Sequence, residues 1–404
     1  MKCSGGISPG TPEMELLLHC ARPAPGAPGA TAPWPVMDWP RFQILATHHH
    51  LLPLAFRYLK SAANEGARVP AEWLEYFKRQ SMQIATFNLR ATGILRRLQR
   101  LARDQGTRLV PIKGPALALW AYGDIALRQF EDLDLVVRRG ELLQTVELFQ
   151  QEGYRLRELP SGADRLRYLA TGHDWSLEQP QKPPHLDLKP VLIAHTLCGP
   201  ESADWLVEAL RPLAMDDGGE LEAPGPEAML LAVCVDGANE GWPKLSAVAD
   251  VAALLASHGS ADWAGLLRDA ARLGQRRSVV VGVWLAASLL ECPLPAALEE
   301  AARRDPAARR LAGDAARALA AGRLPSDVGS GAVWFASQTR DGWCGRLRFW
   351  FRLLFVPGAA DLDVFALPKP LYPLYAFLRP FRLGWDAVWG RPRRIRSRPE
   401  VVSP

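Results

Sequence analysis

The chain has 404 residues, of which 48% are hydrophobic and 23% are charged, and its formal net charge at pH 7 is +5. This length favours two or three structural units, and the composition argues against wholesale disorder and against an integral membrane protein. The six cysteines stand singly, without the short spacing of a zinc site or a redox motif, so we expect reduced and mostly buried thiols.

The N-terminal segment, residues 1–38, contains a short apolar stretch at residues 14–20 and a loop rich in Pro, Gly and Ala at residues 21–35. Because glycines and prolines interrupt this segment repeatedly, we expect no secretion signal and a cytoplasmic protein. The most apolar run of the chain, residues 278–290, is shorter than the roughly 20 residues that cross a bilayer. It predicts a buried helix.

Apolar side chains recur at three- and four-residue spacing from residue 39 to residue 103, which predicts an N-terminal helical region at residues 39–107. The period then alternates between two and 3.6 residues, which predicts a small unit of strands and helices at residues 108–223. Its strands are expected at residues 108–112, 133–137, 154–158, 174–178 and 185–188, and its helices at residues 115–122 and 142–151.

From residue 226 to residue 321 the chain is rich in Ala and Leu at helical spacing, which predicts a helical domain at residues 224–325. The C-terminal region, residues 326–404, mixes aromatic residues with arginines. These aromatic side chains can close over the helical core, form a patch for a membrane surface or contact a protein partner. Five arginines between residues 391 and 398 form either an exposed tail or a contact with acidic lipid or nucleic acid.

The first candidates for chemistry are two aspartates. Asp134 lies in the predicted strand at residues 133–137, and Asp132 stands just before it. Residues two apart on a strand face the same side, so Asp132 and Asp134 can present both carboxylates to one cation while Leu133 and Leu135 face the core. Such hard oxygen ligands suit Mg²⁺ or Mn²⁺. An Asp-x-Asp pattern alone is weak, because a solvated strand end or a surface turn produces it as well.

Two further motifs strengthen this interpretation. In Lys113-Gly114-Pro115, the glycine lets a ligand approach the backbone, and the proline suits the first turn of a helix whose free N–H groups attract phosphate. Asp187 stands between apolar neighbours on a short predicted strand and can point to the same side as the Asp132–Asp134 pair. The alternative for Asp187 is a turn residue next to Pro183 and Pro184.

These residues resemble a known family. The resemblance rests on Ile112-Lys113-Gly114-Pro115-Ala116-Leu117, on Tyr122-Gly123-Asp124, on Arg128 and on Asp132-Leu133-Asp134-Leu135-Val136. It is to the uncharacterised bacterial nucleotidyltransferase family of the polymerase-β-type nucleotidyltransferase superfamily. It extends over most of the chain, with weaker similarity at Gly241-Trp242-Pro243-Lys244-Leu245 and Asp250-Val251-Ala252.

The resemblance implies an α+β fold, with a small mixed-sheet core flanked by N-terminal and C-terminal helical regions. It further implies that Asp132, Asp134 and Asp187 bind two divalent ions, Mg²⁺ or Mn²⁺, together with a nucleoside triphosphate as substrate. Gly114 matches the turn that receives the triphosphate, and Lys113 replaces the serine of many relatives. Lys189 and Asp236 stand where the family often has histidine, which puts the acceptor pocket in doubt.

We therefore expect a metal-dependent nucleotidyltransferase that moves a nucleoside monophosphate from the triphosphate to a hydroxyl acceptor and releases pyrophosphate. Lys113 and Arg128 would offset the charge developing on the triphosphate. Arg128 has a structural alternative, in which it pairs with Asp124 or Glu131 and only shapes the loop. A glycosyltransferase that uses a nucleotide-sugar and an inactive binding protein with this fold are the alternative functions. We predict no specific nucleic-acid partner.

Several other polar residues receive no functional role at this stage. Consecutive histidines on a helix point in different directions, so His48, His49 and His50 predict a solvated or partly buried face rather than a metal cluster. His173 and Asp174, near the predicted sheet, are interpreted in the same way.

Overall fold

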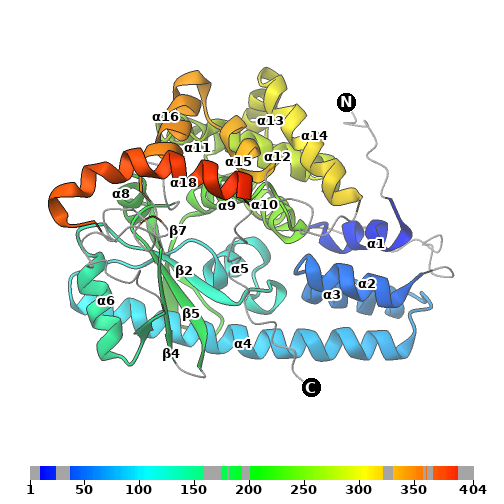
Figure 1. Ribbon diagram of the computed structural model, residues 1–404. Helices are drawn as coiled ribbons and strands as arrows, with labels where there is room; N and C mark the ends of the chain where they lie inside the picture. The colour runs from blue at the N-terminus through cyan, green and yellow to red at the C-terminus, as the bar shows by residue number, and fades with distance from the viewer. Residues whose placement is uncertain are drawn as a thin grey trace.

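The computed structural model describes residues 10–23, 37–157, 174–179, 182–192, 201–321, 331–357, 361 and 367–389. In these residues, helices surround one five-stranded mixed sheet and a separate two-stranded sheet (Figure 1). The α+β fold with helical regions on both sides of the sheet is thus confirmed. The predicted loop at residues 21–35 falls mostly outside the described residues, and so do His173 and the five arginines at residues 391–398.

The N-terminal region is helical, as its three- and four-residue spacing predicts. Prolines stand in the first turns of α1, α2 and α3, where a missing backbone N–H costs nothing. The 34-residue α4 runs along one side of the molecule and packs against α3, the sheet core and the second sheet (Figure 1). The bounds are α1 (Pro12–Ala21), α2 (Trp39–His48), α3 (Leu52–Asn64) and α4 (Ala71–Asp104).

The five-stranded sheet has the strand order β1-β2-β5-β4-β3 in the described residues. Its central strands β2 and β5 are parallel, whereas the other neighbours are antiparallel. The predicted strands and helices are all found, with shifted ends for most of them. They are β1 (Val110–Pro111), α5 (Gly114–Tyr122), β2 (Asp132–Val136), α6 (Leu142–Gln151), β3 (Arg155–Leu156), β4 (Trp175–Gln179) and β5 (Lys182–Lys189).

The sequence patterns did not predict the helix α8 (Glu201–Glu208) or the two-stranded sheet of β6 (Leu210–Ala214) and β7 (Glu220–Pro224). Most side chains of β6 remain partly or fully exposed, so alternation of apolar and polar residues is weak there. A distant side chain supports β7 instead. Gln99 on α4 donates from Nε2 to the carbonyl oxygen of Glu222 at 2.6 Å and accepts from the Glu222 N–H at 3.2 Å.

The predicted helical domain lies on the other side of the molecule from α4 (Figure 1). Its apolar run forms the central helix α12, which packs against α9, α10, α13 and α14, so the prediction of a buried helix is confirmed. None of the described helices combines the length and the apolar character needed to cross a membrane. The bounds are α9 (Pro226–Glu240), α10 (Leu245–Ser257), α11 (Trp263–Arg272), α12 (Arg276–Leu290), α13 (Ala296–Arg304) and α14 (Pro306–Ala320).

The C-terminal region forms α15 (Gly331–Gln338), α16 (Gly342–Phe355), η4 (Lys369–Leu374) and α18 (Tyr375–Trp389). One sequence-based interpretation held that its aromatic side chains close over the helical core. That is wrong for half of the described ones: on α16 Phe349 is buried and Trp350 and Phe355 are partly buried, while Trp343 and Phe351 are exposed. The aromatic pattern therefore marks a surface.

Trp242 fixes the connection between α9 and α10, which carries residues of the cleft described below. Its indole is 1% exposed and packs between two helices that present glycines to it. A Cβ on Gly237 of α9 would lie 2.8 Å from the ring, and a Cβ on Gly282 of α12 would lie 2.9 Å from it. These glycines are required by close packing rather than by backbone flexibility.

We predict that Gly237→Ala destabilises the protein by about 1–3 kcal/mol, because the added methyl group overpacks the Trp242 site. Gly93→Ala is the matched control, because Gly93 lies on the exposed face of α4 and a Cβ added to it would have no atom within 4 Å. That change should be neutral or stabilise by up to about 1 kcal/mol. Urea denaturation measures both free energies of unfolding, and equal values for the two variants would contradict the packing role.

Candidate active site

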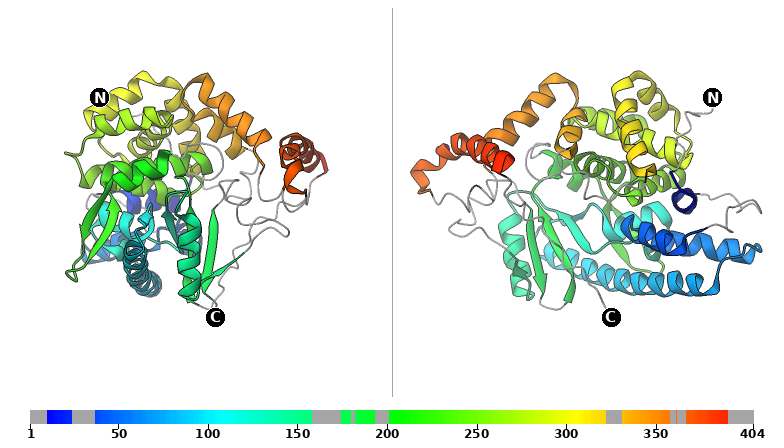
Figure 2. Two further views of the ribbon diagram at one scale, coloured as in Figure 1. Left: turned by 90° about the vertical axis from the view of Figure 1, so that its left-hand side faces the viewer. Right: turned by 45° about the vertical axis from the view of Figure 1, so that its right-hand side comes forward.

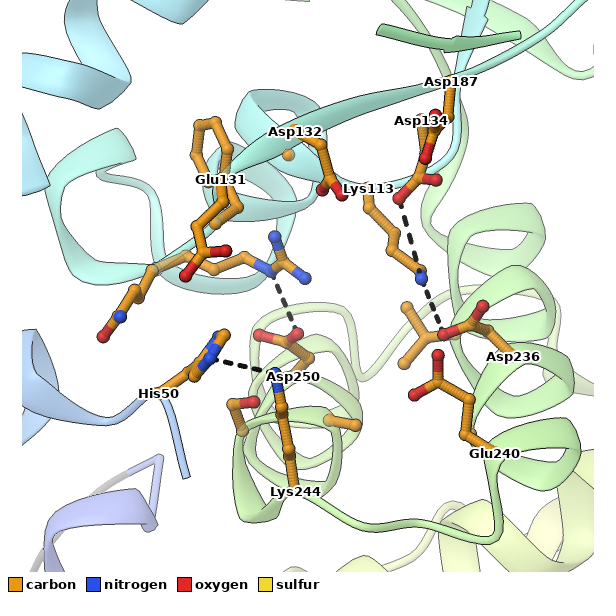
Figure 3. A pocket seen from close by; sticks show the side chains of 18 of the residues that line it. His50, Lys113, Glu131, Asp132, Asp134, Asp187, Asp236, Glu240, Lys244 and Asp250 are labelled. Atoms are coloured by element: carbon orange, nitrogen blue, oxygen red, sulfur yellow. Dashed lines mark hydrogen bonds and ion pairs between the residues drawn. The ribbon is translucent and has the colours of Figure 1, made fainter. Parts of the chain in front are cut away.

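The three predicted aspartates meet on one face of the sheet. Asp132 and Asp134 alternate on β2 with Leu133 and Leu135, which are at most 1% exposed and face the core. The parallel pairing of β2 with β5 sets Asp134 directly opposite Asp187. Figure 3 shows the three carboxylates side by side at the edge of a cleft. The alternative in which Asp187 is a turn residue is wrong, because it lies within β5.

Asp187 is held by a neighbouring strand. Ser176 on β4 lies opposite Asp187 in the antiparallel pairing of β4 and β5. Its hydroxyl donates a hydrogen bond of 2.6 Å to Oδ1 of Asp187. This contact orients one carboxylate oxygen toward the sheet and restricts the rotation of the side chain.

Two lysines compensate the charge of Asp134, which is 9% exposed. The Nζ atom of Lys189 lies 2.8 Å from Oδ1 of Asp134, and the Nζ atom of Lys113 lies 3.7 Å from Oδ2. Burial by itself would raise the pKa of Asp134, but the nearby ammonium groups of Lys189 and Lys113 hold that pKa well below its ordinary value. Asp134 therefore stays ionised although it is buried.

Each lysine also contacts a second carboxylate. Lys113 lies 2.6 Å from Oδ2 of Asp236 on α9, so it bridges the sheet and the helical domain (Figure 3). Lys189 lies 3.6 Å from Oδ2 of Asp174, the residue before β4. Asp174 was assigned no role from the sequence. Its pKa is raised by burial and by the negative charges of Asp187 and Asp134, despite the nearby Lys189.

Gly114 shapes the turn that brings Lys113 to the cleft. Its φ angle of +60° lies in the left-handed region that favours glycine. A Cβ there would also lie 3.4 Å from a methyl group of Leu133 on β2. Both Lys113 and Gly114 line the cleft, at the N-terminal end of α5. The unpaired N–H groups of a helix N-terminus attract anions such as phosphate.

Arg128 is anchored by a partner that the sequence did not identify. Its Nε donates to Oδ2 of Asp250 on α10 at 3.0 Å, and the Tyr122 hydroxyl donates to Oδ1 of the same carboxylate at 2.9 Å. Asp124, one of the two alternative partners, instead caps the 3-10 helix η2 (Ile125–Leu127) by accepting a hydrogen bond from the N–H of Ala126. Asp250 is only 2% exposed, so this is a buried ion pair.

One nitrogen of the Arg128 guanidinium is available to a ligand in the cleft. Its Nη1 is buried and has no hydrogen-bond partner among the described residues, and Arg128 is one of the residues that line the cleft. Asn88 on α4 fixes the backbone of this segment by donating from Nδ2 to the carbonyl oxygen of Arg128 at 2.8 Å. The arginine is thus held from both sides, with a donor left over.

The cleft lies between the sheet and the helical domain and has a volume of about 300 Å³. Its lining carries eight Asp or Glu residues and four Lys or Arg residues, a formal excess of four negative charges that favours binding of cations. The acidic residues are Glu131, Asp132, Asp134, Asp174, Asp187, Asp236, Glu240 and Asp250, and the basic ones are Lys113, Arg128, Lys189 and Lys244.

Several lining residues were missed or set aside from the sequence. His50 lines the cleft, and its Nε2 lies 2.9 Å from Nζ of Lys244. Its neighbour His49 is instead buried and accepts a hydrogen bond from the N–H of Leu245. Glu240 stands four residues after Asp236 on α9, a helical spacing that could have indicated a shared face. The negative charge of Asp236, together with burial, raises the pKa of Glu240.

The fit of a divalent cation can be tested on these side chains. Among the described residues, no three His, Cys, Asp or Glu side chains form a ready-made metal site. The donor chemistry fits nevertheless, because Asp132, Asp134 and Asp187 offer the carboxylate oxygens that Mg²⁺ prefers. The lysines at Asp134 would have to yield to a cation. Each can do so and keep an ionic partner, Asp236 for Lys113 and Asp174 for Lys189.

Comparison with known protein families identifies the family of the chain. A family model described as an uncharacterised nucleotidyltransferase matches residues 35–291, which is more than half of the chain. The matched segment runs from the N-terminal helices through the sheet to α12, so it contains every lining residue of the cleft. No curated protein matches the chain.

We predict that Asp250→Ala destabilises the protein by about 3–5 kcal/mol, because it leaves the buried guanidinium of Arg128 without its ionic partner. Asp314→Ala serves as the control, since the ion pair of Asp314 with Arg317 lies on the surface of α14. Its urea midpoint should hardly change. A small effect for Asp250→Ala would show that the Arg128–Asp250 pair does not hold the helical domain to the core.

Proposed function

The chain belongs to the uncharacterised nucleotidyltransferase family, and on this premise we propose that it transfers a nucleoside monophosphate from a nucleoside triphosphate to a hydroxyl acceptor, with Mg²⁺ or Mn²⁺ as cofactor. The observation that carries the proposal is the strand register that sets Asp134 beside Asp187 on the same sheet face as Asp132. In the reaction, the acceptor oxygen bonds to the α-phosphorus, the bond from that phosphorus to the bridging oxygen breaks, and pyrophosphate leaves.

Asp132, Asp134 and Asp187 would hold the divalent ions, which when bound supply positive charge to the phosphates and lower the pKa of the attacking hydroxyl. Lys113 and Gly114, at the N-terminal end of α5, are the proposed contacts of the triphosphate. The free Nη1 of Arg128 supports a further contact with a phosphate oxygen, because it is a buried donor with no partner in the described part of the protein.

Asp187 is the proposed acceptor of the proton from the attacking hydroxyl. Ser176 engages its Oδ1, and we assign Oδ2 to the acceptor. This arrangement would orient the hydroxyl toward the α-phosphorus and remove its proton during attack.

The alternative functions are less well supported. A glycosyltransferase would also place an Asp-x-Asp pair at a metal, but the family match covers the whole cleft and favours nucleotidyl transfer. An inactive binding protein would not need all three carboxylates on one face. Metal-dependent binding of triphosphate rather than of sugar nucleotide separates these functions.

We predict that labelled nucleoside triphosphate binds in the presence of Mg²⁺ or Mn²⁺ and is released by a chelator. Mutation of a group that only orients a metal ligand typically lowers metal affinity by about 10–100-fold. Asp132 and Asp134 are proposed to bind the metal directly, so Asp132→Asn or Asp134→Asn should weaken metal-dependent binding by at least that factor. Equilibrium dialysis measures this binding, with Asp314→Asn as a control remote from the cleft. Wild-type affinity in both cleft variants would remove these aspartates from the proposed metal site.

A second prediction separates catalysis from binding. Asp187→Asn keeps the shape of the side chain and leaves two carboxylates for the metal, so some triphosphate binding should remain. Turnover should fall by about 10²–10⁴-fold because the proton acceptor is lost, and loss of a metal ligand would add to that fall. Turnover is followed by mass spectrometry of molecules in a cell extract that gain a nucleoside monophosphate, with circular dichroism as a check of folding. Unchanged turnover in the folded variant would exclude Asp187 from the chemistry.

A further inference from the structure

The helices α16 and α18 pack against one another at the edge of the molecule, away from the sheet (Figure 2). Each carries exposed apolar side chains at positions i, i+4 and i+8, which lie along one helix face. The exposed fractions on α16 are 74% for Trp343, 59% for Leu347 and 59% for Phe351. Those on α18 are 66% for Phe377, 79% for Phe381 and 59% for Trp385.

The orientation of α18 is fixed by polar groups on its inner side. Arg379 donates from Nε to the carbonyl oxygen of Leu353 on α16 at 2.7 Å and also pairs with Asp361. Arg382 lies 2.5 Å from the same carboxylate, which is 1% exposed. Because the guanidinium groups are turned inward to Asp361, the aromatic face of α18 is turned outward. The exposure of that face is therefore built into the packing.

Apolar exposure is concentrated in this region. Nine of the twelve large hydrophobic side chains that are exposed among the described residues belong to residues 334–385. The other three, Ile44, Met82 and Leu89, lie on the N-terminal helices. Single exposed apolar residues are ordinary, whereas a contiguous group marks a contact surface.

Charge identifies the kind of partner. The described residues of the C-terminal region (331–357, 361 and 367–389) contain seven Lys or Arg and three Asp, a net charge of +4, although the whole chain carries only +5. Arg348 is exposed next to Leu347 on α16. Two copies of this positively charged region would repel one another, whereas a negatively charged surface would attract the region. Aromatic side chains flanked by arginines suit the boundary between lipid headgroups and acyl chains.

We propose that the α16–α18 face docks on the surface of an anionic lipid bilayer and lies in its interface without crossing it. The exposed stripes of the two helices enter the headgroup boundary, and the exposed Arg348 on α16 contacts lipid phosphate. This proposal is independent of the chemistry of the cleft, because the stripe residues are not among those that line it.

The test uses the full chain and sedimentation with vesicles of phosphatidylcholine alone or with about 30% phosphatidylglycerol. The wild type should bind the anionic vesicles, and the triple variant Phe377→Ser, Phe381→Ser, Trp385→Ser should bind at least about tenfold more weakly. The matched control is Met82→Ser, Leu89→Ser, which removes equally exposed apolar side chains elsewhere and should leave binding unchanged. If the triple variant fails to fold, Trp343→Ser, Phe351→Ser on α16 replaces it.

A second measurement reports where the protein touches the bilayer. Cys344 is exposed next to Trp343, whereas Cys20, Cys234 and Cys292 are buried. With Cys3 and Cys198 changed to Ser, a polarity-sensitive fluorophore on Cys344 should brighten on anionic vesicles only. Failure of the wild type to bind these vesicles would overturn the proposal. So would a triple variant that binds normally, or one that loses only self-association or a protein partner in analytical ultracentrifugation.

Discussion

The cleft depends on compensation of the negative charge that β2 and β5 bring together. Parallel pairing puts Asp134 beside Asp187, and a buried carboxylate needs a cation or several hydrogen-bond donors. Lys189 and Lys113 meet this requirement at Asp134, and each is shared with a second carboxylate. Lys113 also pairs with Asp236 on α9, so a lysine of the site connects the sheet unit to the helical domain on the opposite side of the cleft.

A second buried ion pair, between Arg128 and Asp250, also connects the helical domain to the sheet unit beside the cleft. Asp250 on α10 binds both Arg128 and Tyr122 of the sheet unit, and Asn88 of α4 holds the backbone at Arg128. The N-terminal helix, the sheet unit and the helical domain are thus joined at one point beside the cleft. Tyr122 and Arg128, which belong to the motifs recognised in the sequence, therefore also stabilise the fold. Arg128 can still donate a hydrogen bond to a ligand through its Nη1.

The C-terminal helices use charge in a different way. Asp361 draws two arginines inward and leaves apolar side chains on the outside of α18, the reverse of the usual arrangement on a protein surface. The cleft is polar and the α16–α18 face is largely apolar, and they share no residues. A nucleotidyl-transfer site and a lipid-docking face can therefore coexist on one chain, each supported by its own buried ion pairs.

The sequence by itself determined the local features: the helical regions, the order of strands and helices in the core, the shared face of Asp132 and Asp134, and the glycine turn at Gly114. These follow from periodicity and backbone conformation, which neighbouring residues decide. Only the tertiary structure decided that Arg128 pairs with Asp250, that Lys189 pairs with Asp134 and Asp174, and that Gln99 supports β7. A pattern shows which side chains share a face, but what covers that face depends on the packing of segments far apart in the chain, and so the aromatic face of α18 was found exposed rather than buried.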